Sequence, residues 1–197
     1  MKNEDVVMGS RLLASTCASR DWLARLQEMV ERQRPNVVCL LGASLSEQEV
    51  AALEALPVGC VFVSPRWASG YKSPPANTAK VIWLGNGPCK VGSLVVAGMP
   101  CKGKEGDAAD IVSAGLMSPK TPRVLVSSVS EWQGKAANFQ QLTVIGADAE
   151  KPFSYKSSRG LWGDAVGLNL RPYGAVVISF TFFAGHFFSM HVEDATP

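Results

Sequence analysis

The sequence predicts an α/β fold in which a β-α-β-α-β first half precedes a second half rich in strands. Apolar runs alternate with amphipathic segments up to about residue 63, and short apolar runs separated by polar loops dominate afterwards. The chain has 197 residues, of which 47% are hydrophobic, and this length is ordinary for one domain with a substantial core. We therefore expect a short N-terminal tail over residues 1–10 and a single domain over residues 11–197.

Hydrophobic spacing predicts the first strand and helix. The apolar run at residues 12–16 predicts a short strand. Apolar residues then recur at helical spacing from Trp22 onward, and Pro35 stops the run because proline lacks the N–H that a helix needs. Residues 36–41 form a near-continuous apolar run, which is typical of a strand covered on both faces. Together these segments predict a β-α-β unit.

A capping box predicts the second helix. Ser46 is followed three residues later by Glu49, a pattern that satisfies the unpaired N–H groups at the start of a helix. The helix is expected to continue through Leu56 and to end at Pro57. Residues 58–63 predict the third strand, and the crossovers between these strands should be right-handed.

Helical signals become sparse in the second half. Residues 66–80 contain adjacent prolines and a glycine, and they predict a long exposed loop. One short helix is expected over residues 107–116, and the pair Ala184-Gly185 suits a tight turn between the last two strands. The predicted strands are residues 81–84, 94–97, 124–127, 142–145, 165–170, 176–183 and 186–192.

Charge and hydropathy bear on the class of protein. Charged residues make up 18% of the chain and the formal net charge is +2, so the whole sequence carries no polyanion-binding signal. No apolar run reaches the roughly 18 residues that cross a bilayer, and the first ten residues lack the apolar core of a secretory signal. We expect a cytoplasmic or nuclear protein without a membrane span.

The cysteines do not form a metal-binding pattern. There are five, with no C-x-x-C pair and only two histidines in the chain, which excludes ordinary zinc-ribbon and zinc-finger spacing. Cys39 and Cys60 lie in apolar strand patterns and are expected to be buried. Cys17 follows the first strand, where a catalytic thiol is weighed against a structural one. The structural reading is favoured because no base lies near it in the sequence.

Five apolar segments end in short loops at spacings that resemble a known family. They are RLLASTCASR (11–20), VVCLLGA (37–43), CVFVSPRW (60–67), VLVSS (124–128) and LTVIGADAE (142–150). Their order and spacing, from about Arg11 to the C-terminus, resemble the calcineurin-like metallophosphoesterases, in which such segments end in D-x-H-G, G-D, G-N-H, a histidine and G-H-x-H-E. The resemblance implies an αββα sandwich.

The metal ligands of that family are missing from this chain. The resemblance implies that the vestigial metal-site positions are Thr16, Ala18, Ala43, Pro65, Arg66, Ser128, Ala147 and Ala149. Two-metal hydrolysis requires a cage of His, Asp and Asn side chains around two cations, and these residues cannot build one. We therefore expect a pseudoenzyme with no catalytic residue, no bound metal and no cofactor.

The predicted terminal hairpin suggests a surface for a partner. If Ala184-Gly185 is the turn, Ile178, Phe180, Phe182 and Phe187 share one face, and Val177, Phe183, Phe188, Met190 and Val192 share the other. Both faces are then apolar, and the cover for the second comes either from the fold or from a partner chain. Tryptophans in loop-like segments are further anchors. The partner-binding candidates are Phe180, Phe182, Phe183, Phe187, Phe188, Trp67, Trp132 and Trp162.

A basic stretch suggests a different kind of ligand. Residues 66–104 carry six lysine or arginine residues and no acidic one, and aromatic residues lie among them. Nucleic-acid binders combine such charges with aromatic platforms, although six cations over this length are also ordinary for a solvated rim. The polyanion-binding candidates are Arg66, Lys72, Lys80 and Lys90.

Two classes of function compete. The first is a catalytically inactive scaffold or interaction subunit of a multiprotein complex, similar to the phosphoesterase-fold subunit of the retromer coat, with protein partners and with self-association as a further option. The second is an RNA- or polyanion-associated module, or a residual phosphoesterase with unconventional ligands. The segment KVIWLG (80–85) somewhat resembles spliceosomal proteins that accompany lariat debranching, which keeps the second class open. Fold analogy alone does not separate them.

Overall fold

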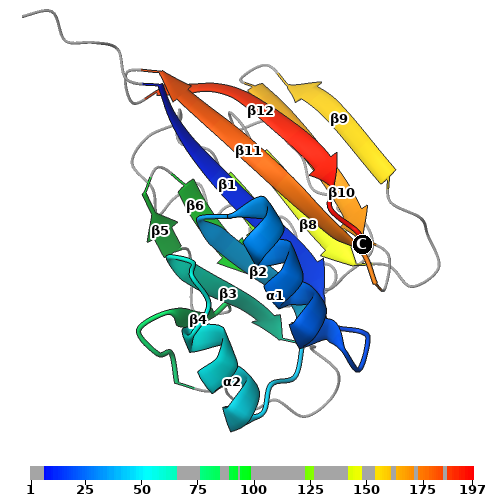
Figure 1. Cartoon of the computed structure of the whole chain (residues 1–197). Coiled ribbons are helices and arrows are strands. Elements are labelled where there is room, and N and C mark those ends of the chain that lie inside the picture. The colour runs from blue at the N-terminus through cyan, green and yellow to red at the C-terminus, as the bar shows by residue number, and fades with distance from the viewer. Residues whose placement is uncertain are drawn as a thin grey trace, which may run out of the picture.

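Two six-stranded sheets form the body of the protein in the part of the chain that the structure describes. Two helices lie against one face of the first sheet (Figure 1). The architecture is a two-sheet α/β sandwich, which agrees with the predicted α/β class. The predicted helix at residues 107–116 and the predicted turn at residues 184–185 lie outside the described residues. The computed structural model describes residues 7–65, 76–84, 89–92, 94–98, 123–126, 142–147, 154–160, 163–170, 173–183 and 186–197.

The first sheet contains the β-α-β-α-β unit that the sequence predicts. Its strand order is β12-β11-β1-β2-β3-β4. Strands β1, β2, β3 and β4 run parallel to one another, whereas β11 is antiparallel to both β1 and β12. The elements are β1 (Val7–Thr16), α1 (Trp22–Gln33), β2 (Val37–Ala43), α2 (Glu47–Glu54), β3 (Cys60–Pro65), β4 (Val81–Trp83), β11 (Ala175–Phe183) and β12 (His186–Asp194).

The second sheet has the order β5-β6-β7-β8-β10-β9. Its inner strands are parallel, and the two edge strands β5 and β9 are antiparallel to their neighbours. Both edge strands escaped prediction, because β5 is only three residues long and the polar sequence SYKSSRG of β9 shows no apolar alternation. The strands are β5 (Cys89–Val91), β6 (Leu94–Gly98), β7 (Arg123–Val126), β8 (Leu142–Ala147), β9 (Ser154–Gly160) and β10 (Gly163–Leu170).

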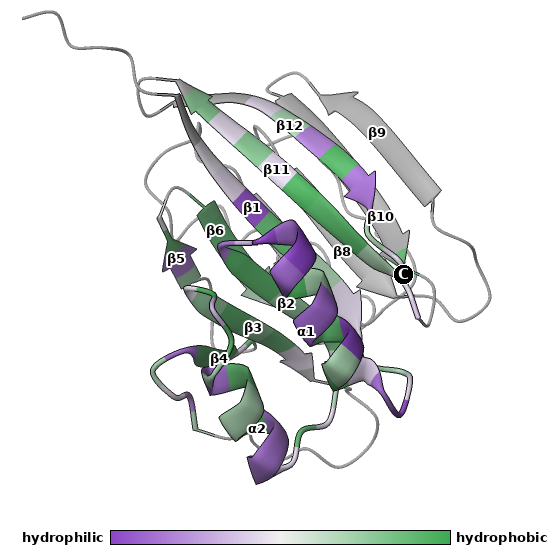
Figure 2. Cartoon of the chain, in the orientation of Figure 1, coloured by the Kyte–Doolittle hydropathy of each residue, from purple (hydrophilic) through white to green (hydrophobic). Residues whose placement is uncertain are grey.

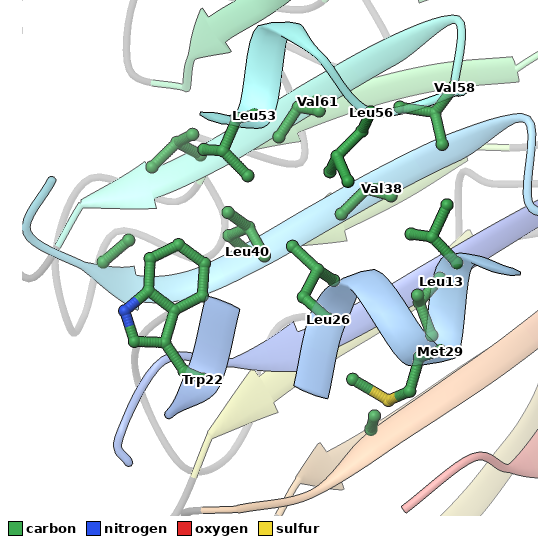
Figure 3. Packing of buried hydrophobic residues seen from close by; sticks show 14 of the residues in the cluster. Leu13, Trp22, Leu26, Met29, Val38, Leu40, Leu53, Leu56, Val58 and Val61 are labelled. Atoms are coloured by element: carbon green, nitrogen blue, oxygen red, sulfur yellow. The ribbon is translucent and has the colours of Figure 1, made fainter. Parts of the chain in front are cut away.

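Two hydrophobic clusters hold these layers together. The inter-sheet core joins side chains of both sheets, including Leu12, Phe62, Val96, Leu170 and Ile178. The helix-side core packs α1 and α2 on the opposite face of the first sheet (Figure 3), and it includes Leu13, Trp22, Leu26, Leu40, Leu53 and Val61. Burying one leucine of this kind contributes about 1.5–3 kcal/mol to folding. This double burial explains why β2 reads as an uninterrupted apolar run.

Local sequence determines where the helices begin and end. The predicted capping box is present, since the Ser46 N–H donates to Glu49 Oε2 at 2.7 Å and the Glu49 N–H donates to Ser46 Oγ at 3.3 Å. Helix α1 ends at Gln33, because Arg34 adopts a left-handed conformation with φ 48° and Pro35 follows. None of the described helices combines the length and the apolar character needed to cross a membrane.

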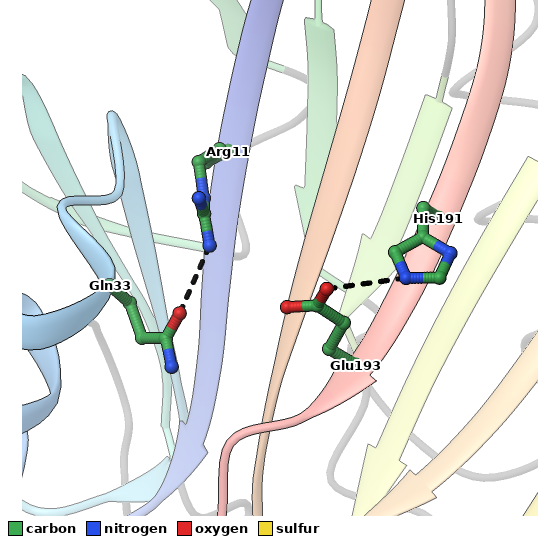
Figure 4. A network of polar contacts seen from close by, with 4 residues as sticks. All are labelled: Arg11, Gln33, His191 and Glu193. Atoms are coloured by element: carbon green, nitrogen blue, oxygen red, sulfur yellow. Dashed lines mark hydrogen bonds and ion pairs between the residues drawn. The ribbon is translucent and has the colours of Figure 1, made fainter.

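The first strand is longer than predicted. It begins at Val7 rather than at Leu12, so residues 7–10 belong to the sheet and not to the predicted tail. The added residues lack an apolar run, and they are ordered by antiparallel pairing with β11, in which Val7 lies opposite Phe183. At the other end of this stretch, the guanidinium of Arg11 donates to Gln33 Oε1 at 3.0 Å and ties β1 to α1 (Figure 4).

A bulge in the terminal hairpin overturns the predicted division of its faces. The pairing of β11 with β12 shifts by one residue between Thr181 and Phe182, so Thr181 lies opposite Ser189 instead of Phe188. One extra residue exchanges the two faces of a strand beyond it. Met190 and Val192 were predicted on the face of Val177, and they instead pack against the inter-sheet core. The opposite face of β12 carries exposed Ser189, His191 and Glu193 and is therefore polar.

Candidate functional site

Four of the eight predicted metal-site positions are the last residues of strands. Thr16, Ala43 and Pro65 are the last residues of β1, β2 and β3, which are parallel neighbours, so the three strands end at one edge of the first sheet. Ala147 ends β8 in the second sheet, and Figure 1 shows the arrowhead of β8 directed toward the same end of the sandwich. Ligands bind at such edges in many α/β proteins. Arg66, Ser128 and Ala149 lie outside the described residues.

Thr16 is hydrogen-bonded to the backbone just before β11. Its backbone N–H donates to the carbonyl oxygen of Gly174 at 3.2 Å, and its hydroxyl contacts the same oxygen at 3.4 Å. The residue is 8% exposed. The start of β11 therefore lies directly against the position where the family resemblance implies an aspartate. Gly174 carries no sequence signal for this role, because the contact is made by its backbone carbonyl.

Ala43 points away from the inter-sheet space. Regular alternation would place it on the same face as Leu41, which belongs to the inter-sheet core. Gly42 between them has φ +68°, and the pairing of β2 with β3 shifts there. The side chain of Ala43 consequently enters the helix-side core and is fully buried. The three strand ends share one edge, but Ala43 does not share a face with Leu41.

Ser64 is a buried polar group with no hydrogen-bond partner among the described residues. It precedes Pro65 at the end of β3, it is 1% exposed, and its hydroxyl oxygen bonds to none of them. Alternation from Phe62 places it on the inter-sheet side. Leaving a hydroxyl in this state costs about 1–3 kcal/mol. No pattern in the sequence indicates this state, because a serine at the end of a strand is usually solvated.

Cys17 lies in a structural setting that does not activate a thiol. Burial, with a smaller contribution from the negative charge of Glu49, raises the pKa of Cys17 to about 12. Glu49 accepts hydrogen bonds from the backbone N–H of Ser46 at 2.7 Å and from the indole N–H of Trp22 at 3.2 Å. These bonds, chiefly the one from Ser46, hold the pKa of the Glu49 carboxyl below its usual value. A thiol becomes nucleophilic as the thiolate, which this environment disfavours. The structural reading of Cys17 is therefore supported.

The remaining described residues at this edge offer few donors for a cation. Ala18 is exposed, and its methyl group cannot bind a metal. Within the described residues, no three His, Cys, Asp or Glu side chains come close enough to hold a metal ion together. Tyr173, which precedes Gly174, is 56% exposed at this edge, and its carbonyl oxygen accepts a hydrogen bond from Arg25 at 3.2 Å.

Two of the predicted partner-binding residues belong to the core of this chain. Phe180 and Phe182 are 2% and 4% exposed, and both lie in the inter-sheet core. The fold itself covers that face of the hairpin, so these two residues are not available to a partner. The side chains of Phe183, Phe187 and Phe188 are not among those the structure describes, and Trp67, Trp132 and Trp162 lie outside the described residues altogether.

Lys80 has a structural role in place of the predicted polyanion contact. Its ammonium group donates to the carbonyl oxygens of Glu54 and Leu56 at 2.7 and 2.6 Å. A cation at this position satisfies free carbonyls at the end of α2 and interacts favourably with the helix dipole. The hydroxyl of Thr78 donates to the Glu54 carboxylate, and this bond is the main reason that the pKa of Glu54 is lowered. Lys90 is exposed on β5, and Arg66 and Lys72 lie outside the described residues.

Two solved structures are similar to this chain in fold. One crystal structure aligns with a TM-score of 0.55 and 13% identity, over 95% of this chain and 99% of its own. The crystal structure of TT1561 from Thermus thermophilus aligns with a TM-score of 0.54 and 12% identity, over 95% of this chain and 100% of its own. No family model and no curated protein matches the chain. At this identity the likeness concerns the fold alone.

Proposed function

We propose that this protein is a catalytically inactive member of the metallophosphoesterase-like αββα sandwiches that serves as a scaffold or interaction subunit of a multiprotein complex. The observation that carries the proposal is the composition of the strand ends. Thr16, Ala43 and Pro65 end three adjacent parallel strands at the edge where the resemblance implies metal ligands. None of them supplies a carboxylate, imidazole or amide.

The contacts at this edge support the same proposal. Hydrolysis through two metals depends on oxygen and nitrogen ligands that hold the cations about 3.5–4 Å apart and activate a water between them. The Thr16 hydroxyl already contacts the Gly174 carbonyl, and the methyl group of Ala43 is packed in the helix-side core. The sandwich is retained, but these strand ends carry no side chains suited to holding two metal ions. Such a protein is better suited to binding other proteins than to hydrolysing phosphoesters.

A metal and activity assay tests the loss of catalysis. The full chain should bind no stoichiometric manganese or zinc by elemental analysis after dialysis, and it should not hydrolyse a generic phosphodiester with added manganese. One or two metals per chain, together with hydrolysis above the buffer blank, would overturn the proposal. The scaffold role is tested separately by pull-downs with quantitative mass spectrometry. If the protein is inactive but no partner is recovered at a stoichiometric ratio, the scaffold role alone is overturned.

The polyanion alternative receives less support. Of its four candidate residues, Lys80 is committed to the end of α2, whereas Lys90 is exposed. Of the two candidates that the structure describes, only Lys90 is therefore exposed, and one lysine does not form the basic face that nucleic acids require. A salt-dependent affinity for single-stranded RNA that falls in Lys90→Met but not in Lys80→Met would favour this alternative over the scaffold.

A further inference from the structure

Arg11 carries a positive charge that no carboxylate balances among the described residues. It is half-buried on the helix side of the first sheet, where its Nη2 donates to Gln33 Oε1 at 3.0 Å (Figure 4). Its Nε–H is buried and has no hydrogen-bond acceptor in the described part of the chain. A guanidinium stays protonated, and the amide of Gln33 is neutral, so this bond leaves the charge uncompensated. Arginines removed from water are usually paired with an acceptor that bears the opposite charge.

The strand register places two small hydroxyl side chains beside this guanidinium. Arg11 lies directly opposite Ser179 of β11, and Thr181 follows two residues later. Phe180 between them packs in the inter-sheet core, so Ser179 and Thr181 face the helix side. Figure 2 shows this alternation of hydrophobic and weakly polar positions along β11. Directly opposed Cβ atoms in an antiparallel pair lie about 4.5–5.5 Å apart, so a group bound by Arg11 also lies near these hydroxyls.

Gly9 leaves room on the same side of the sheet. It lies opposite Thr181, two residues before Arg11 on β1, and it is exposed. A Cβ atom on Gly9 would come within 4 Å only of the carbonyl oxygen of Phe180 among the described residues, at an ordinary contact distance of 3.8 Å. Alternation puts that Cβ atom on the face of Arg11. The space that a side chain would fill there is therefore open to a ligand.

We propose that Arg11, Ser179 and Thr181 form a binding site for a phosphate group on the helix side of the first sheet. The guanidinium supplies the charge and its remaining Nη donors, and the two hydroxyls donate from the neighbouring strand. Donors that come from two strands suit the several oxygens of a tetrahedral phosphate better than the two oxygens of a planar carboxylate. This site goes beyond the proposed function and does not depend on it, because it contains none of the strand ends that the metal-site argument uses.

Two features limit the affinity of this site. Glu193 lies on the same face, on the strand beyond β11, and its negative charge opposes an anion. Helix α1 ends at Gln33, and the partial negative charge at the C-terminus of a helix also disfavours an anion. We therefore expect weak binding, with a Kd of about 1 mM at low ionic strength, that weakens further as salt is added.

Titrations of the isotope-labelled full chain followed by NMR test the site. Inorganic phosphate and O-phosphoserine should shift the backbone amide signals of residues 9–11 and 179–181, whereas serine should not. Binding of both probes identifies a site for phosphate monoesters, and binding of inorganic phosphate alone identifies a site for the free ion. Shifts confined to other parts of the chain, or acetate binding as tightly as phosphate, would show that the proposal is wrong.

Charge variants test which residues bind the phosphate. Arg11→Gln should weaken binding by about tenfold or more, because it removes the positive charge and the donors of the guanidinium. Arg20→Gln removes an exposed arginine elsewhere and is the matched control, which should bind phosphate as the parent does. Glu193→Gln removes the opposing charge and should strengthen binding by about two- to threefold. Equal affinity in Arg11→Gln and the parent would overturn the proposal.

Gly9→Val tests the space without removing a donor. Valine suits a strand, and its Cβ atom meets no close neighbour among the described residues, so the variant should remain folded by circular dichroism. Its side chain should nevertheless fill the space beside Arg11 and abolish phosphate binding. A folded Gly9→Val protein that binds phosphate like the parent would contradict the proposed site, and this test holds even if Arg11→Gln fails to fold.

Discussion

Replacing Ala43 by aspartate places at the end of β2 the residue type that the metallophosphoesterase resemblance implies for this position. The structure predicts that this change destabilises the protein, because the side chain of Ala43 is fully buried among the hydrophobic residues of the helix-side core. A neutral buried carboxyl without hydrogen bonds costs about 1–3 kcal/mol. Ionising it is costlier, so its pKa should rise, and a rise of about three units adds about 4 kcal/mol at neutral pH.

The pH dependence follows from the direction of that shift. The folded pKa of the new carboxyl lies above its unfolded value of about 3.9, so the added penalty is absent in more acidic solution. It should grow by about 1.4 kcal/mol for each pH unit up to the folded pKa and then level off. Urea unfolding of Ala43→Asp and of the parent, compared at several pH values, measures this difference.

Two control variants isolate the charge. Ala43→Asn has nearly the same volume and cannot ionise, so its destabilisation relative to the parent should not change with pH. Ala18→Asp introduces the same carboxylate at an exposed vestigial position and should change stability by no more than about 0.5 kcal/mol. If Ala43→Asp is as stable as the parent at neutral pH, the end of β2 is open to water and the argument from burial is wrong.

Further substitutions test other contacts. Gly42→Ala should destabilise the protein by about 1–2 kcal/mol in thermal unfolding because φ is +68° there, even though a Cβ atom would meet no neighbour among the described residues. Phe180→Ala should cost about 3–5 kcal/mol of folding stability, and the protein that remains folded should bind partners as the parent does. Loss of binding without loss of stability would show instead that Phe180 contacts a partner. Lys80→Met should lower the free energy of unfolding in urea by about 0.5–1.5 kcal/mol, because it removes hydrogen bonds to the end of α2. Lys90→Met changes an exposed position and should leave this free energy unchanged.

Local sequence signals in the first half of the chain were sufficient to predict its order of strands and helices. The capping box at Ser46, the stop at Pro35 and the apolar run of β2 predicted elements that the structure contains. These signals act within a few residues of the chain, so they can be recognised without knowing the fold. The absence of metal-ligating residues at the strand ends is likewise a property of the sequence.

Contacts between distant segments decided the rest. The bulge that moves Met190 and Val192 to the inner face arises in the pairing of two strands and leaves no periodic signal of its own. The cap formed by Lys80 joins residues 24 and 26 positions apart, and the contact of Thr16 with Gly174 spans 158 positions. Short-range patterns cannot encode which distant partner a side chain meets, because that choice depends on how the sheets and helices pack. The sequence alone therefore determined the α/β class and the residue types at the strand ends. Tertiary packing decided which face each of these residues occupies, and that Lys90 is exposed whereas Lys80 bonds to the end of α2.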